Sequence, residues 1–296
     1  MDRRSTTLIS VVAVLILGAC AAQGPASPQV VATTSILADV VSNAVGQPVE
    51  SLIPPGAEPH DYRPSARQAA TVADAALVVA NGLGLEQGLE TLLDSAEADG
   101  VPVLEVGPLV DPRPLASSPE GVLDPHVWLD PLRMARAVRL VGERLAELDP
   151  TPPLPARADA YAAELEALDR RIADILAAVP PQRRLLVTAH DSLGYFADRY
   201  GFRIVGTLVP GGSTLAEPNP ADIAELVRQI DATGVEVIVI EAGGPSDLAR
   251  AVAAESARPI RLVELFIGSL GPPGSGADTY IGMMETNARR IADALG

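Results

Sequence analysis

The chain has 296 residues, of which 48% are hydrophobic, so it is long enough to build two domains with a core in each. Its formal net charge of −16 makes nucleic acid a poor partner, because phosphate-binding surfaces are rich in basic residues. Length and charge therefore exclude a single small domain and argue against a nucleic-acid-binding protein.

The N-terminus has the layout of a secretory signal. Two arginines precede an apolar run at residues 8–17, which is shorter than the ~20 residues that span a bilayer. A Leu-Gly-Ala sequence that resembles a bacterial lipobox then leads to Cys20, the only cysteine, which cannot form an internal disulfide. We predict a signal peptide at residues 1–19, a lipid on Cys20 and a small, polar tether at residues 20–28. An ordinary cleaved signal with an incidental cysteine, or twin-arginine export, is the alternative.

Short β-branched runs alternate with helical patterns in the next part of the chain, which is typical of βα units around a parallel sheet. Strands are predicted at residues 30–33, 49–53, 76–80 and 103–106. Helices are predicted at residues 36–45, 66–73, 85–97 and 131–148. Residues 29–151 are therefore expected to form an N-terminal α/β lobe.

One long amphipathic helix is predicted within residues 152–181. Apolar residues recur at spacings of mostly three or four from Tyr161 to Val179, with charged residues between them. About 24 helical residues would reach roughly 36 Å, the length of two lobes. A surface helix of one domain is the alternative, but the position between two βα series favours a connecting helix.

A second βα series occupies residues 182–296 and predicts a C-terminal α/β lobe. Its strands are expected at residues 185–188, 203–208, 235–240 and 260–263. Its helices are expected at residues 192–199, 220–231, 245–254 and 278–295. The predicted fold class is therefore α/β, with two lobes of parallel sheet flanked by helices and joined by one long helix.

The three histidines of the chain, His60, His126 and His190, each lie in a predicted loop or just after a strand. In open α/β sheets the ligand crevice lies beyond the carboxyl ends of the strands, so all three could converge on one cleft. Imidazole is the commonest protein ligand for zinc, and a tetrahedral site needs four donors. A lone histidine in such a loop is more often a hydrogen-bonded surface residue, but the absence of other histidines favours a shared metal site.

Asp278 is the candidate for the fourth donor, in a glycine-rich loop before the last predicted helix. Capping of that helix is an equally good explanation of Asp278, and the sequence leaves the two open. Metal-bound imidazoles usually donate their second N–H to a carboxylate or carbonyl. Four further aspartates close to the histidines could orient the rings in this way: Asp61, Asp124, Asp130 and Asp191.

Several motifs follow one another along the chain in an order that matches a known family. The most specific is Asp-Pro-His-x-Trp-x-Asp-Pro at residues 124–131, which no single capping or turn rule predicts. The other segments are residues 30–36, 59–65, 81–86, 190–196, 217–218 and 278–287. At these segments the chain resembles the zinc/manganese-binding solute-receptor lipoproteins of ABC transporters, the cluster A-I substrate-binding proteins.

The resemblance implies a metal held in the cleft between the two lobes, with His60 and His126 from the N-terminal lobe and His190 and Asp278 from the C-terminal lobe. It further implies a monomer, lipid-anchored outside the cytoplasm, that delivers the metal to an ABC-type permease in the cytoplasmic membrane. Manganese-binding members often carry Glu where this chain has His190. Imidazole-rich sites also suit zinc better than manganese, so Zn²⁺ is the predicted cargo and Mn²⁺ the alternative.

One departure from the family pattern and two other functions also have to be considered. The loop at residues 107–123 has no histidine, which puts in doubt the zinc-gathering role of the corresponding loop in related zinc receptors. A secreted zinc hydrolase would need a general base, for which Glu58 or Glu241 is available, but no His-Glu-x-x-His motif is present. A surface adhesin or metallochaperone of the same fold is the other alternative. For a metal receptor we expect affinity to fall below about pH 6.5, the ordinary pKa of histidine.

Overall fold

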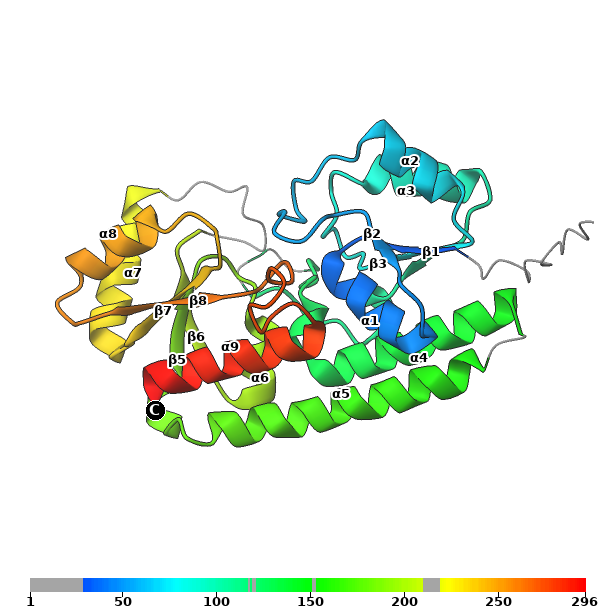
Figure 1. The fold of residues 1–296 in the computed structure, drawn as a ribbon. Helices are drawn as coiled ribbons and strands as arrows, with labels where there is room; N and C mark the ends of the chain where they lie inside the picture. Colours follow the sequence, from blue (N-terminus) through cyan, green and yellow to red (C-terminus); the bar gives the residue numbers. More distant parts are fainter. Residues whose placement is uncertain (1–28, 117, 119–120, 151–152, 210–218) are drawn as a thin grey trace, which may run out of the picture.

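The computed structural model describes residues 29–116, 118, 121–150, 153–209 and 219–296, which form two α/β lobes above a pair of long helices (Figure 1). The predicted signal peptide, Cys20, the tether and residues 217–218 lie outside the described residues. Within the described part, no helix combines the length and the apolarity required to cross a bilayer.

The N-terminal lobe is built on a parallel sheet with the strand order β2-β1-β3-β4. Its strands are β1 (Val30–Ala32), β2 (Glu50–Ser51), β3 (Leu77–Ala80) and β4 (Val103–Glu105). Its helices are α1 (Ser35–Val45), α2 (Ala66–Ala73), α3 (Glu90–Ala98) and α4 (Pro131–Leu148), with short 3₁₀ turns η1 (Gly107–Leu109) and η2 (Val127–Leu129). The predicted order of strands and helices is confirmed.

The first half of one predicted helix is a loop instead. A helix was expected at residues 85–97, but α3 begins at Glu90. Glu86 turns into the lobe and its carboxylate accepts hydrogen bonds from the Thr33 hydroxyl at 2.6 Å and from the Asn81 amide at 2.8 Å. A buried carboxylate with these partners pins the segment as a turn, which the apolar periodicity of the sequence does not reveal.

The long connecting helix is α5 (Leu154–Leu176), and its 23 residues give a length of about 34 Å. It packs against α1 and α4 of the N-terminal lobe and against the last helix, α9 (Tyr280–Leu295), of the C-terminal lobe. The contact with α4 is close because Gly142 of α4 has no side chain. A Cβ there would lie 2.5 Å from the Cβ of Ala158. The predicted connecting helix is therefore present.

The C-terminal lobe repeats the architecture with the parallel strand order β6-β5-β7-β8. Its strands are β5 (Leu185–Thr188), β6 (Arg203–Thr207), β7 (Val237–Glu241) and β8 (Arg261–Leu265). Its other helices are α6 (Gly194–Tyr200), α7 (Pro220–Thr233) and α8 (Asp247–Glu255), and a 3₁₀ turn, η3 (Pro181–Arg183), precedes β5.

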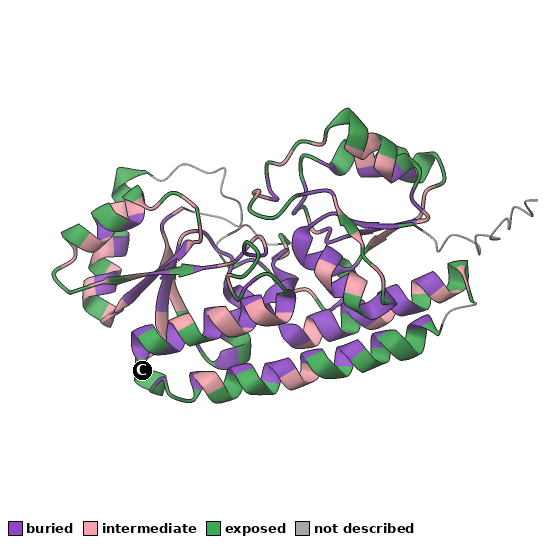
Figure 2. Ribbon diagram, in the orientation of Figure 1, coloured by how far each residue is buried: buried purple, intermediate pink, exposed green. Residues whose placement is uncertain are grey.

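One hydrophobic core connects the two lobes. It joins residues of both sheets to the buried faces of α1, α4, α5 and α9, for example Val79, Val138, Leu165, Val239 and Ile291. Smaller cores under α2 and α3 and under α7 and α8 cover the outer faces of the two sheets. Figure 2 shows the same division, with exposed residues on the outer sides of α2, α7 and α8 and on the outer side of α5. Both sheets are therefore supported by the same hydrophobic core, and the carboxyl ends of their strands meet above it.

Candidate metal centre

Three loops bring the histidines together where the lobes meet. His60 lies in the loop between β2 and α2, and His126 directly precedes η2. His190 follows the end of β5 by two residues. The hydroxyl of Thr188 donates to the His190 carbonyl at 2.7 Å, and the Ser192 amide donates to it at 2.8 Å, which fixes this loop on the strand. The predicted convergence of the three histidines is present in the structure.

The three imidazoles form a compact, buried cluster, called here the histidine cluster. One nitrogen from each ring lies within 4.8 Å of the other two, and the side chains are at most 3% exposed. The Nε2 atoms of His126 and His190 are 3.3 Å apart. Zinc–nitrogen bonds of about 2.0–2.1 Å at tetrahedral angles place two donors about 3.3 Å apart, so this pair fits a common metal ion.

The other ring nitrogens show which donors are free. Asp124 accepts from the His126 backbone amide at 3.0 Å and contacts its Nδ1 at 2.8 Å, which holds a proton on Nδ1 and leaves Nε2 to bind a metal. The Nδ1 atoms of His60 and His190 are buried without a hydrogen-bond partner among the described residues. His190 meets His126 through its Nε2 atom, so its unpaired Nδ1 is the ring nitrogen that does not face His126.

Burial keeps the cluster in the form that binds metals. It lowers the pKa of His60 and of His126 to about 3, and it lowers that of His190 well below its usual value, with a further contribution from the two neighbouring rings. It raises the pKa of Asp124 to about 7, although the His126 amide opposes this shift. The imidazoles are therefore neutral at physiological pH, as ligation requires.

Of the four aspartates near the histidines, Asp124 contacts an imidazole nitrogen, Nδ1 of His126, at 2.8 Å. Asp130 instead caps α4, accepting from the Leu132 amide at 2.9 Å, and it pairs with Arg133. Asp61 is exposed. Asp191 is buried, and its charge favours protonation of His126.

Trp128 has a role that sequence reasoning missed. Its ring lies 5.3 Å from the ring of His126, and its Nε1 donates to the carbonyl of Ile267 in the other lobe at 2.7 Å. The Tyr280 hydroxyl in turn donates to the Trp128 carbonyl at 2.7 Å. The motif at residues 124–131 contained the signal, because it places the one tryptophan of the sequence two residues after a candidate ligand.

The structure does not bring Asp278 to the three histidines. Asp278 is exposed, and its carboxylate accepts from the Gly274 amide at 2.9 Å. The loop closes on itself through a hydrogen bond from the Gly271 amide to the Ala277 carbonyl. Thr279, rather than Asp278, caps α9. Asp278 as a ligand thus stays a sequence prediction, and its capping role belongs to the next residue.

Two other carboxyl groups lie beside the cluster. Glu58 accepts from the His60 amide at 3.2 Å, and Glu241, at the end of β7, accepts from the Gly268 amide at 2.7 Å. Burial, and then the charge of Glu241, raises the pKa of Glu58 to about 7. Burial likewise raises the pKa of Glu241. Glu241 therefore lies within electrostatic reach of Glu58, which contacts the backbone of His60.

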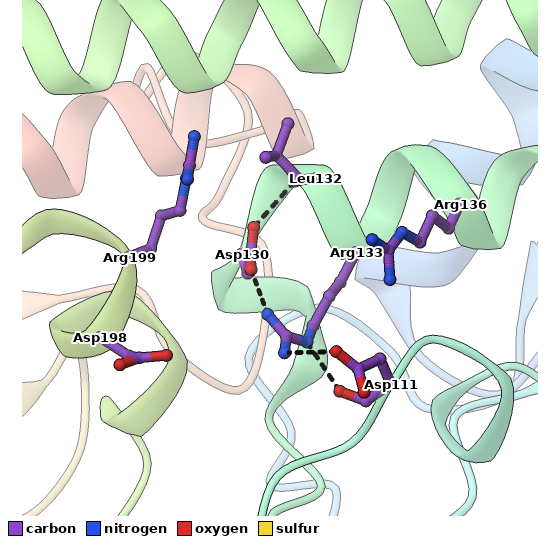
Figure 3. A pocket seen from close by; sticks show the side chains of 7 residues that line it. All are labelled: Asp111, Asp130, Leu132, Arg133, Arg136, Asp198 and Arg199. Atoms are coloured by element: carbon purple, nitrogen blue, oxygen red, sulfur yellow. Dashed lines mark hydrogen bonds and ion pairs between the residues drawn. The ribbon is translucent and has the colours of Figure 1, made fainter.

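A separate cavity of about 230 Å³ lies between α4 and α6 and is called here the charged cavity (Figure 3). It is lined by Asp111, Asp130, Leu132, Arg133, Arg136, Asp198 and Arg199. Arg133 pairs with Asp130 and Asp111, while Arg199 reaches Asp169 of α5 at 2.7 Å. Cationic and anionic groups balance here, and no histidine is present, so this cavity is not a candidate metal site.

Comparisons with known proteins identify the family of the chain. The model of the family described as zinc-uptake complex component A, periplasmic (ZnuA), matches residues 30–294. A manganese-binding lipoprotein, MntA, of Halalkalibacterium halodurans is 31% identical over 100% of this chain and 99% of its own. The zinc-binding protein TroA of Treponema pallidum is 32% identical over 90% of this chain and 89% of its own.

Solved structures share the fold of this chain. The periplasmic zinc-binding protein TroA superimposes with a TM-score of 0.82 at 33% identity, covering 91% of this chain and 99% of TroA. A manganese-bound periplasmic metal-binding protein from Candidatus Liberibacter asiaticus, at 22% identity and a TM-score of 0.80, shares the fold. From the family match over nearly its whole length, we conclude that the chain belongs to the ZnuA family of metal-binding ABC-transporter substrate-binding proteins.

Proposed function

We propose that the protein captures a divalent transition metal, zinc in preference to manganese, with His60, His126 and His190. The observation that carries this proposal is a buried cluster of three neutral imidazoles, in which one nitrogen from each ring lies within 4.8 Å of the other two. The relatives compared above are named as binding proteins, so we do not propose the hydrolase.

The preference for zinc rests on donor chemistry. Three nitrogen donors suit zinc, whereas manganese favours a larger share of oxygen donors. The relatives do not decide the metal, because MntA is named manganese-binding and TroA zinc-binding. Competitive titration of zinc against manganese measures the preference directly.

Binding of the metal can change how the two lobes are arranged relative to each other. His60 and His126 belong to one lobe and His190 to the other, so a metal bound by all three favours the closed arrangement. Four backbone or side-chain contacts from residues 267–270 already reach the N-terminal lobe, including Ser269 to the Gly56 amide at 2.7 Å and Trp128 to Ile267. Figure 1 shows this red loop against α1. A permease that recognises the closed form would then accept the loaded receptor.

The route of delivery completes the proposal. The signal predicted at residues 1–19 and Cys20 support a lipid anchor on the extracytoplasmic face of the membrane, where we expect the protein to act as a monomer and an ABC-type permease to take the metal. Several relatives are named lipoproteins, among them the manganese ABC transporter substrate-binding lipoprotein PsaA of Streptococcus mitis.

Metal titration of the mature protein tests the site. His126→Ala should lower zinc affinity at least about 100-fold, because the ~10–16 kcal/mol of a four-ligand zinc site is shared among its donors. Arg228→Ala on α7, an exposed residue paired only with Glu225 among the described residues, is the control and should bind like the parent. Undiminished zinc affinity in His126→Ala would refute the site.

A further inference from the structure

The histidine-free loop that follows η1 leads directly to the carboxylate that contacts the metal cluster. An antiparallel bridge between Pro114 and Leu123 joins the two described flanks of this loop. Next to the bridge, the Arg113 carbonyl accepts a hydrogen bond from the Asp124 amide at 2.9 Å. The side chain of the same aspartate contacts Nδ1 of His126. Whatever holds the flanks of this loop therefore also determines where that carboxylate lies.

Tyr195 of α6, in the C-terminal lobe, holds both flanks through one hydroxyl group. The hydroxyl donates to the Asp124 carbonyl at 2.8 Å and accepts from the Arg113 amide at 3.1 Å. The residue is 1% exposed, so water does not compete for these two hydrogen bonds. The guanidinium groups of Arg113 and Arg133 lie over the ring, with their Cζ atoms 5.8 and 4.8 Å from its centroid. A side chain of one lobe thus fixes the backbone of the other lobe at Asp124.

The first residue of α6, Gly194, leaves room for the Asp124 carboxylate itself. A Cβ built on Gly194 would lie 2.8 Å from Oδ2 of Asp124 and 3.2 Å from Nη1 of Arg113. The Arg113 guanidinium also donates to the Gly194 carbonyl. The interactions of Gly194 and Tyr195 with Arg113 and Asp124 are called here the Tyr195 contact. Through this contact the C-terminal lobe bounds both the backbone and the side chain of Asp124.

We propose that Tyr195 is a positioning residue for the metal site, which holds Asp124 in place when the lobes are closed and thereby makes His126 a better donor. This inference rests on the proposed function. The partner of the second ring nitrogen orients a metal-bound imidazole and raises its basicity. Here that partner belongs to the N-terminal lobe but is held by the C-terminal lobe. Separation of the lobes would break the Tyr195 contact and free the carboxylate, so opening would weaken the hold on the metal.

Zinc titration and the rate of zinc release to a chelator test the proposal with Tyr195→Phe, which keeps the ring but removes the hydroxyl. Affinity should fall about fivefold, less than the 10- to 100-fold typical of a group that touches a metal ligand directly, and release should be faster. Tyr200→Phe, on the same helix, is the matched control. Its buried hydroxyl donates to Asp169 of α5 at 3.1 Å and does not contact Asp124, so this variant should bind zinc like the parent.

A second variant tests the carboxylate from the other side. Gly194→Ala should lower affinity about 10-fold, because the added Cβ displaces the side chain that orients His126. In an Asp124→Ala background there is no carboxylate to position, so Tyr195→Phe and Gly194→Ala should each add less than about twofold. Losses that are as large in that background as in the parent would overturn the proposal.

A proton signal separates positioning from a general loss of stability. In the zinc-loaded protein labelled with ¹⁵N-histidine, the Nδ1–H of His126 should exchange with solvent faster in Tyr195→Phe than in the parent, and at the parental rate in Tyr200→Phe. A parent that does not bind zinc refutes the proposed function. A parent that binds zinc, with Tyr195→Phe unchanged in affinity and exchange, refutes this inference alone, and an equal loss of affinity in Tyr200→Phe does the same.

Discussion

The histidine cluster and the charged cavity lie at the same junction of the two lobes, yet they differ in whether their polar groups have partners within the protein. In the cluster, two ring nitrogens are buried without a partner among the described residues. In the cavity, Arg133 and Arg199 each have a carboxylate partner. Buried groups without partners cost free energy unless a ligand satisfies them, whereas paired groups stabilise the fold without one. The contrast separates a binding site from a structural contact.

The largest expected effect that tests this comparison is the shift in the pKa of the histidine rings in the cluster. Burial places the pKa of His60 and His126 near 3, so neither ring should titrate between pH 8 and pH 5 in the metal-free protein. NMR signals of the imidazole rings measure this directly, and the chain has only three histidines. A ring that titrates near pH 6.5 would show that the cluster is not closed as described, and would restore the pH dependence expected from sequence.

The sign of the effect on stability follows from the same shifts. A histidine whose pKa is lowered by folding binds its proton more readily when unfolded, so its contribution to stability falls as pH drops from about 6.5 toward 3. Asp124 and Glu58, whose pKa values rise to about 7, act in the opposite direction, because folding favours their protonated forms below that pH. The two contributions oppose each other, which is why ring titration is a better measurement than overall acid stability.

The next effect tests the cavity. Arg199→Met should lower the free energy of unfolding by about 3 kcal/mol, because the Tyr200 hydroxyl at 3.1 Å is then the remaining partner of the buried Asp169 carboxylate among the described residues. Zinc affinity should remain within about twofold of the parent, since additivity holds for sites without shared partners. Denaturant unfolding and metal titration of the same preparation check both halves. Loss of affinity without loss of stability would mean that the cavity belongs to the binding site.

A smaller effect sharpens the role of Asp124. Asp124→Asn should weaken zinc binding about 10-fold, because the amide oxygen still accepts from His126 but the negative charge that makes the imidazole a better donor is lost. Asp61→Asn, an exposed neighbour of His60, is the control and should change affinity less than about twofold. Equal effects of the two variants would contradict the assignment of ring orientation to Asp124.

The architecture and the three histidine ligands could be predicted from the sequence, because the pattern of each element is local and the chain offers no other histidines. Alternating strands and helices predict two parallel sheets, prolines bound the region of α5, and the chain has no other histidines to compete with His60, His126 and His190. Each of these features can be read without knowing where the chain turns back on itself.

The parts that could not be predicted depend on how distant loops are oriented. Asp278 stays a predicted ligand, and the hydrogen bond that its carboxylate accepts from the Gly274 amide depends on the turn of a glycine-rich loop, which the sequence does not specify. Glu86 resembles a surface residue of a helix until its three buried hydrogen-bond donors are known.

The smallest effect concerns the link between the lobes. Trp128→Phe keeps an aromatic ring beside His126 but removes the hydrogen bond to the Ile267 carbonyl, which is then buried without that donor. Such a loss costs about 1 kcal/mol, so zinc affinity should fall about fivefold if this bond stabilises the closed lobes to which the metal binds. Because Trp128 is the only tryptophan, its variant has to be measured by chelator competition, while zinc-dependent tryptophan fluorescence in the parent reports the same bond. An unchanged affinity in Trp128→Phe would mean that the three histidines alone hold the lobes together, and that the contact between Trp128 and Ile267 forms equally in the metal-free and metal-bound protein.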